Sequence, residues 1–423
     1  MTRYDALEVH VEIRGATVLA GRAQFHRNRG SLSSTTFQYD GDYLAGAHSY
    51  EIDPSLPFVT GSQYVEGLPG AFSDSAPDRW GRNLVTKQER DRARREVRAP
   101  RALDDVDFLV GVGDVTRQGA LRFRRDPSAA FLDPDHRVPK LVRLPEMLRA
   151  ADSVAGDGDD FAAVKMLLDA GTGSLGGARP KASVLGDDGR QLIAKFPHHA
   201  DAWDVMAWEA TALDLAEAAG VVVATHDLVE VDGRHLLLLD RFDRVAHPAV
   251  GRADRADRVG YVSAMTLLGR HDGETADYVD LAEVITEVST RADDDLLQLF
   301  RRVAVSIGLN NTDDHLRNHG FLRHRAGWVL SPAFDVNPNP DPGLRQTTIA
   351  GADAVRDEAG ALSLLGESCR LTATAVRTEL RAIAEVLGRW REVALRNGVR
   401  SSETKRFEGS FDAGLDALGE AAA

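Results

Sequence analysis

The sequence contains only one cysteine, Cys369, in 423 residues. A single cysteine excludes an intramolecular disulfide and any structural zinc site built on several cysteines. Such sparse use of cysteine is typical of proteins that work in the reducing cytoplasm. We therefore expect Cys369 to be a buried thiol of the core rather than a reactive one.

Long apolar runs are also missing. A helix that crosses a bilayer needs about 20 consecutive apolar residues, and no stretch of this sequence approaches that length. The first residues, MTRYDALEVHVEIRG, lack the basic and then apolar pattern of a secretory signal peptide. The sequence therefore predicts a cytoplasmic protein without a membrane partner.

There is no surplus of basic residues either. The formal net charge of -14 argues against a free-standing nucleic-acid-binding protein. One local exception is the run KQERDRARREVRAPR from Lys87 to Arg101. A solvated helix with internal ion pairs is the default interpretation of this run, and a direct nucleic-acid contact is the alternative. The length allows two or three domains.

Hydrophobic periodicity predicts a small antiparallel sheet at the N-terminus and a largely helical second half. The expected strands are 7–13, 17–25, 36–40, 43–47, 119–123, 182–185, 191–196, 221–224, 228–231 and 235–240. The expected helices are 104–112, 144–155, 161–170, 203–219, 260–269, 278–290, 296–310 and 373–397. A further helix is expected from about Pro77, capped by Ser75 or Asp78, and a partly frayed tail after Ser401.

The chemistry is concentrated between Gly308 and Asn337. Asp313 is followed by Asn318, then by two short apolar pieces that read as a hairpin, and finally by Asp335. A transferring phosphoryl group carries charge that must be neutralised, and the attacking hydroxyl needs a proton acceptor. A carboxylate, an amide oxygen and a second carboxylate supply that acceptor and the hard oxygen ligands of Mg²⁺. The pattern predicts a catalytic loop, a hairpin and a metal loop.

Two other interpretations of this stretch stay open at this point. Asn, Asp and Gly gather in turns for conformational reasons alone. Asp313, Asp314, His315 and His319 also have the side chains of a zinc or manganese hydrolase site.

A glycine-rich loop precedes a predicted hairpin that carries Lys195. Its glycines would let backbone amides approach phosphate groups, while Pro180 excludes a Walker A motif. Lys195 lies in an otherwise apolar strand, where an ammonium group needs a ligand or a carboxylate. Glu209 on the next helix is the candidate carboxylate, with a surface-facing Glu209 as the alternative. The strand LLLLD then runs into Arg241, as a nucleotide-binding hinge would.

Taken together, these motifs resemble the HipA family, serine/threonine kinases that act as toxins of bacterial toxin–antitoxin pairs. The resemblance extends over nearly the whole chain. The matching segments are LPGAFSDSAPDRWGR and GALRF (N-terminal subdomain), GSLGGARPKASV (phosphate loop), IAKFP (nucleotide lysine), LLLLDRFDR (hinge), NTDDHLRNHGFL (catalytic loop) and SPAFDVNP (metal loop).

The resemblance implies an α+β, two-lobed protein-kinase-like fold with a small β-rich N-terminal subdomain and a mostly helical C-terminal lobe. We expect the N-terminal subdomain at 1–130, the nucleotide-binding part of the kinase core at 131–243, and the helical lobe at 244–423.

The family also implies a role for each candidate site residue, with ATP and Mg²⁺ as cofactors. Asp313 would be the base with His315 in support, and Asn318 and Asp335 would hold Mg²⁺. The implied nucleotide-binding residues are Lys195, Lys181, Gly173, Ser174, Gly176, Gly177, Asp240 and Phe242. Asp240 stands where the family more often has glutamate, so a side-chain contact with adenine is in doubt there.

Ser174 matches the serine that family members phosphorylate on themselves, and a phosphate there would repel nucleotide. The implied partners are a small helix-turn-helix antitoxin resembling HipB, a protein substrate of the translation machinery, and DNA reached mainly through the antitoxin. The alternatives are a catalytically inactive nucleotide-binding regulator, a small-molecule kinase, and a phosphoesterase using Asp313, His315 and His319.

Overall fold

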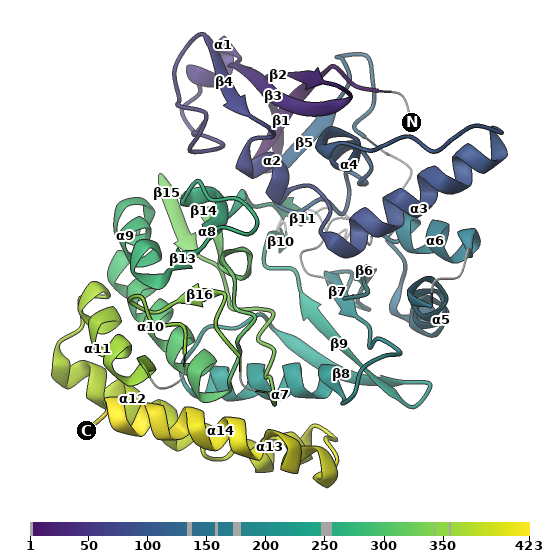
Figure 1. Ribbon diagram of the computed structural model, residues 1–423. Helices are drawn as coiled ribbons and strands as arrows, with labels where there is room; N and C mark the ends of the chain where they lie inside the picture. Colours follow the sequence, from purple (N-terminus) through teal and green to yellow (C-terminus); the bar gives the residue numbers. More distant parts are fainter. Residues whose placement is uncertain are drawn as a thin grey trace. The chain divides into compact units, whose positions relative to one another are not determined.

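The computed structural model describes residues 3–132, 138–156, 160–171, 179–246, 256–341, 343–354 and 357–423 (Figure 1). The chain forms two compact units. The first contains Met1–Ala200, Val231–Arg234 and Leu238–Val262, and the second contains Asp201–Glu230, His235–Leu237 and Ser263–Ala423. The three-domain division at residues 130 and 243 stays a prediction.

The first unit begins with an antiparallel sheet in the order β4-β3-β2-β1-β5. Its strands are β1 (Ala6–Ile13), β2 (Ala16–Asn28), β3 (Ser31–Tyr39), β4 (Ser62–Glu66) and β5 (Leu121–Arg124). Consecutive residues of strand β1 are buried. Because alternate side chains of a strand point to opposite sides of the sheet, both faces of β1 are covered. Leu7 and Val9 lie among apolar side chains, while the buried Glu8 accepts hydrogen bonds from Arg124 (2.8 Å) and Arg22 (3.2 Å).

The expected strand at 43–47 is wrong. Residues Gly41–Leu44 form the short helix α1, because the Asp40 side chain accepts a hydrogen bond from the Asp42 backbone and caps the turn. Tyr43 is buried, and its hydroxyl donates to the carbonyl of Tyr50 (2.9 Å).

Helices cover the rest of the first unit: α2 (Gly70–Asp74), α3 (Arg79–Arg95), α4 (Asp105–Val110), the 3-10 turn η1 (Leu141–Arg143), α5 (Leu144–Ala155) and α6 (Phe161–Asp169). Asp78 caps α3 by accepting a hydrogen bond from the Gly81 backbone (2.7 Å), as predicted. Helices α3, α5 and α6 enclose a core that includes Trp80, Leu84 and Leu167.

The basic run on α3 carries the expected ion pairs within the helix. Arg92 pairs with Glu96 (2.9 Å), and Arg95 pairs with Asp91 (2.7 Å). Because these pairs join positions four residues apart on a solvent-exposed face, the solvated-helix interpretation is confirmed for them. The alternative of a nucleic-acid contact stays untested.

A second sheet has the order β6-β7-β9-β8. Its strands are β6 (Lys181–Leu185), β7 (Gln191–Lys195), β8 (His226–Val231) and β9 (Arg234–Asp240). Strands β6 and β7 form an antiparallel hairpin in which Lys181 lies opposite Lys195. Strand β9 passes from one unit to the other. It is followed in the first unit by the β10 (Arg244–Ala246) and β11 (Ala256–Arg258) pair.

The second unit is mostly helical: α7 (Val205–Ala218), α8 (Ala264–Leu267), α9 (Tyr278–Val288), α10 (Ala292–Gly308), α11 (Glu358–Ser368), α12 (Ala373–Leu387), α13 (Trp390–Arg396) and α14 (Ser401–Ala421). Its β-structure is small: β13 (Ala276–Asp277), β14 (Gly320–His324), β15 (Gly327–Leu330) and β16 (Thr347–Thr348), with β12 (Tyr261–Ser263) entering from the first unit. The predicted hairpin is therefore confirmed as β14–β15. The α+β fold, with a β-rich first part and a mostly helical second part, is also confirmed.

Four expectations for the chain after residue 220 are wrong. Residues 260–269 form β12 followed by the one-turn helix α8, residues 221–224 form only a bridge from Val223 to Ala333, and the helix expected at 373–397 breaks near Gly388. The chain after Ser401 is the helix α14 rather than a frayed tail. Its residues Phe407 and Phe411 are one helical turn apart and pack against Trp208, so burial of aromatic surface stabilises the helix.

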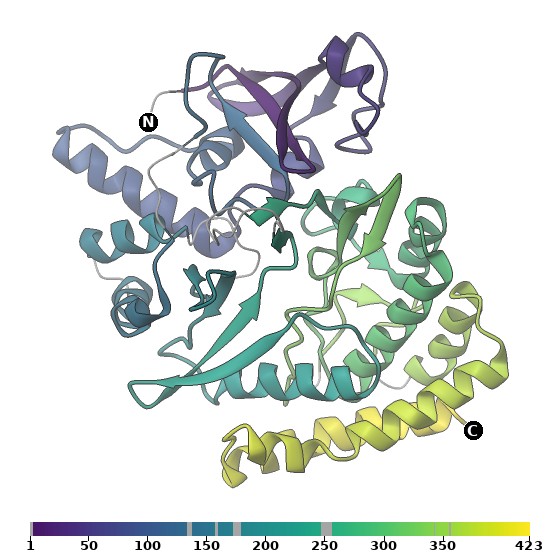
Figure 2. The same cartoon turned by 180° about the vertical axis from the view of Figure 1, so that it is seen from behind.

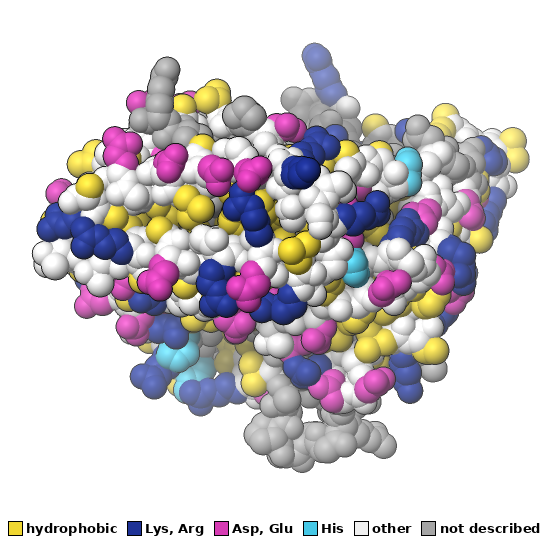
Figure 3. Space-filling model, turned by 90° about the horizontal axis from the view of Figure 1, so that it is seen from below, with side chains coloured by type: hydrophobic (Ala, Val, Ile, Leu, Met, Phe, Trp, Pro, Cys, Tyr) yellow, Lys and Arg dark blue, Asp and Glu magenta, His cyan; other side chains and the backbone are white. Residues whose placement is uncertain are grey.

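Helix α14 packs against α10 and α12, and it lies beside α12 in both cartoon views (Figures 1 and 2). The molecular surface seen from below the view of Figure 1 shows basic and acidic side chains interspersed, without an extended patch of one sign (Figure 3). Among the described residues, no helix combines the length and the apolar character that crossing a membrane would require.

Candidate functional site

Helix α10 leads directly into the predicted catalytic loop. The helix ends at Gly308, and Asn310 then adopts a left-handed backbone conformation (φ 49°) that turns the chain. The Asn310 side-chain amide donates to the carbonyls of Asn339 (2.7 Å) and Asp341 (3.1 Å). These bonds tie the start of the catalytic loop to the segment that follows the predicted metal loop.

Asp313 lies at the surface of the second unit, on this loop. Its carboxylate accepts a hydrogen bond from the side-chain amide of Gln346. Partial desolvation raises the pKa of Asp313 above the ordinary 3.8, and the charges of Asp335 and Asp314 act in the same direction. The imidazole of His315 and the Gln346 hydrogen bond act against this rise. A carboxyl group whose pKa is raised is a better proton acceptor.

Asn318 and Asp335 accompany Asp313. Asn318 ends the 3-10 turn η3 (Leu316–Asn318), and its side-chain NH₂ group donates to the Asp313 carbonyl (3.3 Å). The side-chain oxygen of Asn318 is the atom that can bind a cation. Asp335 follows β15 and has a left-handed backbone (φ 60°), an uncommon conformation for a residue other than glycine. Its carboxylate accepts from Asn337 (3.1 Å) and is close enough to Asp313 to raise that residue's pKa.

These side chains fit a magnesium ion by their chemistry. The set consists of two carboxylates and an amide oxygen, which are hard ligands of the kind that Mg²⁺ takes together with phosphate and water. The mutual repulsion of Asp313 and Asp335 is the condition that a bound cation relieves. Asn318 and Asp335 are therefore the residues that would hold the ion.

Asp314, next in the chain to Asp313, has the opposite environment. Its buried carboxylate accepts from the hydroxyls of Tyr278 (2.6 Å) and Ser306 (3.1 Å) and lies 3.2 Å from the imidazole of His319. Burial works to raise the pKa of Asp314, but the His319 charge and these hydrogen bonds hold it at about 2. Asp314 therefore anchors the loop from inside. The pattern DDH gave no signal that separates the two carboxylates.

A small pocket of about 20 Å³ adjoins Asp314, which is room for one water molecule. Its polar lining includes Arg302, Asn311 and His319. Within the described part of the chain, no three His, Cys, Asp or Glu side chains are arranged to hold a metal ion. Of the residues in the metal-hydrolase alternative, Asp314 and His319 face each other in the interior, whereas Asp313 is exposed.

The predicted nucleotide-binding lysines lie on the β6–β7 hairpin of the first unit. Lys195 ends β7 and is a buried residue with only 6% of its surface exposed. Lys181 begins β6 and forms a buried ion pair with Asp78, the residue that caps α3 (2.6 Å). Gly173, Ser174, Gly176 and Gly177 lie outside the described residues.

Glu209, the proposed carboxylate partner of Lys195, is fully buried on α7, so the surface-facing alternative is wrong. Its pairing with Lys195 stays a prediction. Asp240 ends β9, where its carboxylate pairs with Arg190. Two residues later, the ring of Phe242 is stacked on the ring of Tyr261, with 6.4 Å between their centroids.

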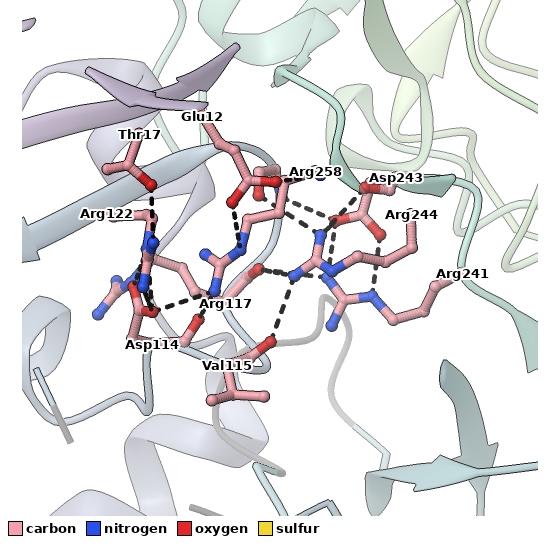
Figure 4. Close-up of polar contacts among 11 residues, drawn as sticks. Glu12, Thr17, Asp114, Val115, Arg117, Arg122, Arg241, Asp243, Arg244 and Arg258 are labelled. Carbon is pink, nitrogen blue, oxygen red and sulfur yellow. Dashed lines mark hydrogen bonds and ion pairs between the residues drawn. The ribbon is translucent and has the colours of Figure 1, made fainter. Parts of the chain in front are cut away.

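A buried arginine cluster fixes the predicted hinge to the N-terminal part of the same unit (Figure 4). Asp243 accepts hydrogen bonds from Arg241 (2.6 Å) and Arg244 (2.8 Å), and from the backbone of Gly119 (2.8 Å). Both arginines also donate to backbone carbonyls of residues 116–117 (each 2.6 Å). Burial works to raise the pKa of Asp243, but the two arginine charges outweigh it and lower the pKa.

Sequence reasoning treated Arg241, Asp243 and Arg244 only as part of a hinge motif. The structure shows that their side chains are nearly inaccessible, with exposed fractions of 1%, 4% and 4%. Burial lowers the pKa of Arg244 to about 9. The alternation of charges in RFDR is the signal that would have suggested a buried ion-pair network.

Two domain models of one family match this chain. Residues 173–394 match the HipA-like C-terminal domain, and residues 17–124 match the HipA N-terminal domain. A curated relative, "Putative kinase Y4mE" of Sinorhizobium fredii, is 28% identical over 149 residues. That match covers 34% of this chain and 33% of the relative, so the chain matches about a third of the relative's length.

Two solved structures align with this chain to different extents. HipA in the Shewanella oneidensis complex of HipA, HipB and operator DNA aligns over 97% of this chain and 96% of its own, with a TM-score of 0.70 and 15% identity. The Helicobacter pylori kinase CtkA aligns over 51% of this chain and 94% of its own, with a TM-score of 0.35 and 13% identity. The first likeness shows that the fold is that of HipA, and the matched C-terminal domain covers more than half of the sequence. The chain belongs to the HipA family.

Proposed function

We propose that this protein is a serine/threonine kinase that transfers the γ-phosphoryl group of ATP, with Mg²⁺, to a protein hydroxyl. The observation that carries the proposal is the grouping of Asp313, Asn318 and Asp335 on one side of the second unit. Asp313 is exposed to an incoming substrate, has a raised pKa, and is accompanied by the two oxygen donors of a metal site.

In this reaction Asp313 orients the attacking hydroxyl and accepts its proton as the new oxygen–phosphorus bond forms and the bond to the ADP oxygen breaks. His315 supports the loop beside Asp313. Lys195 and Lys181 contact the phosphates of the nucleotide in this proposal. Asp240 and Phe242 flank its adenine ring. When bound by Asn318 and Asp335, Mg²⁺ neutralises charge on the phosphates.

The biological role that we propose is that of a toxin in a toxin–antitoxin pair. The support is family membership and the printed description of the Shewanella HipA structure, which is a complex with HipB and operator DNA. A HipB-like antitoxin would bind this chain and carry most of the DNA contact. The protein substrate belongs to the translation machinery in this proposal, and phosphorylation of Ser174 in the glycine loop switches the enzyme off by charge repulsion.

The test is transfer from γ-labelled ATP by the purified full chain. Wild-type protein is expected to label itself at Ser174, and Asp313→Asn is expected to lower the transfer rate by at least about a hundredfold, because proton acceptance and orientation are lost together. Lys195→Met is expected to weaken nucleotide binding. Full transfer by Asp313→Asn would remove the mechanism.

The same assay separates the alternatives. Label on a metabolite rather than on protein would identify a small-molecule kinase. Tight ATP binding without any transfer would identify an inactive regulator. Phosphate release from an ester substrate that survives Lys195→Met would favour the phosphoesterase.

A further inference from the structure

A well-anchored segment crosses the catalytic loop in the second unit. We call residues 345–351 the strap. Arg345 is buried and forms an ion pair with the buried Glu358, and it also donates to the backbone carbonyl of Asn311 (3.0 Å). At the other end, the backbone N–H groups of Ala350 (3.1 Å) and Gly351 (2.7 Å) donate to one carboxylate, that of Asp277.

The middle of the strap is fixed as well. Residues Thr347–Thr348 form β16, which pairs in parallel with β13 (Ala276–Asp277). The Thr347 hydroxyl donates to the backbone carbonyl of Asp314 (2.8 Å), and the Gln346 backbone donates to the carbonyl of Thr312 (3.3 Å). The strap is therefore held on both sides of the catalytic aspartate.

Gln346 differs from its neighbours in the direction of its side chain. Arg345 and Thr347 are buried and Gln346 is exposed, as expected where alternate residues of an extended segment point to opposite sides. The exposed side chain reaches Asp313 and donates to its Oδ1 atom. Because a carboxylate only accepts hydrogen bonds, the NH₂ group of Gln346 must face it.

This hydrogen bond has a consequence for the reaction. The terminal torsion of an aspartate side chain is broad, so the carboxylate of an exposed Asp313 is not fixed by its own rotamer preference. A donor held by a rigid strap fixes it and leaves the Oδ2 atom to receive a hydroxyl. We propose that Gln346 is the positioning residue of Asp313, which rests on the kinase function proposed above.

The test compares two variants at Gln346 with a control on the neighbouring chain. Gln346→Glu keeps the shape of the side chain but removes the donor and adds a like charge, whereas Gln346→Leu removes the polarity. Leu344→Ala is the control, because Leu344 is 67% exposed two residues away. We expect transfer at saturating ATP to fall by about 10- to 100-fold in both Gln346 variants, as a misdirected base would cause.

The KM for ATP is expected to stay within about twofold of wild type in both variants, since Gln346 fixes the base and not the nucleotide. A merely structural role would change both parameters, or would lower the melting temperature. Rates within about twofold of wild type in Gln346→Glu and Gln346→Leu, with Asp313→Asn inactive, would overturn the positioning role and leave the kinase function standing.

A second measurement does not need activity. The chain has eight glutamines, so the side-chain amide resonance of Gln346 can be assigned in glutamine-labelled protein by its loss in Gln346→Leu. If the hydrogen bond exists, Asp313→Asn shifts this resonance while Leu344→Ala does not. An unmoved resonance in Asp313→Asn would overturn the proposal even if the wild-type protein transferred no phosphate.

Discussion

The three glycines of α14 provide a sharp test of how the second unit is packed. Gly409, Gly414 and Gly419 lie five residues apart on one helix. A Cβ atom at Gly414 would lie 2.9 Å from both the Cα and the carbonyl oxygen of Gly308 and would also overlap the Ile307 carbonyl. At Gly409 and Gly419 nothing lies within 4 Å. Only Gly414 therefore lets α14 approach the end of α10.

The alanine substitutions are expected to change the free energy of unfolding in opposite directions. Alanine has a helix propensity about 0.5–1 kcal/mol better than glycine, so Gly409→Ala and Gly419→Ala are expected to stabilise the protein by about that amount. Gly414→Ala gains the same propensity but forces backbone atoms apart by roughly 1 Å in a packed core. Overpacking of this kind costs about 1–3 kcal/mol, so we expect a net loss of up to about 2 kcal/mol.

Urea denaturation of the three variants measures these differences in the free energy of unfolding, with the slope monitored to confirm that the same unit unfolds. In a thermal scan, each kcal/mol corresponds to about 2–4 °C for a unit of this size. If all three alanine variants were equally stabilised, α14 would not pack on α10 through Gly414, and the helix would be closer to the frayed tail that the sequence suggests.

Two further perturbations test the charge networks. Asp243→Ala leaves the buried guanidinium groups of Arg241 and Arg244 without their shared carboxylate, and we expect a loss of about 3–5 kcal/mol in the urea-derived free energy of unfolding. The His226 ring donates a hydrogen bond to the Asp214 carboxylate, which raises the pKa of His226 above 6.5 in the folded protein. The resulting stabilisation is fully present below pH 6.5 and lost as pH rises through the folded pKa, so His226→Asn should cost more stability near about pH 6 than near about pH 9.

The Asp243→Ala and His226→Asn tests each have a matched control variant. Asp5→Ala removes a surface carboxylate that is 87% exposed beside Arg27, and such a pair contributes only about 0–1 kcal/mol. An equal loss in Asp5→Ala and Asp243→Ala would contradict the role of burial. For His226, the pH dependence should become much weaker when Asp214→Asn removes the carboxylate charge, and an unchanged dependence would point to another titrating group.

Local patterns in the sequence predicted much of the fold. The spacing of apolar residues placed α5 at 144–155, as found, and predicted the N-terminal strands and the hairpin of β14 and β15. The Asp78 cap was visible because a short acceptor stands just before an apolar helical pattern. These features depend on neighbours within a few residues of one another, so sequence alone carries them.

Long-range packing decided the rest. The apolar face of α14 is interrupted by glycines and charges. It becomes a stable helix because Trp208 and Trp390 cover Phe407 and Phe411 and because α10 packs against α14. Helix propensity alone could not foresee that burial.

The candidate site shows the same division most clearly. The sequence by itself determined that two aspartates stand together at 313 and 314, followed by Asn318. Only the tertiary structure decided that Asp313 faces solvent with a raised pKa, whereas Asp314 is enclosed by Tyr278 and its neighbours with a pKa of about 2. The physical reason is that the role of a carboxylate depends on the water, charges and donors around it, and segments distant in the sequence provide these.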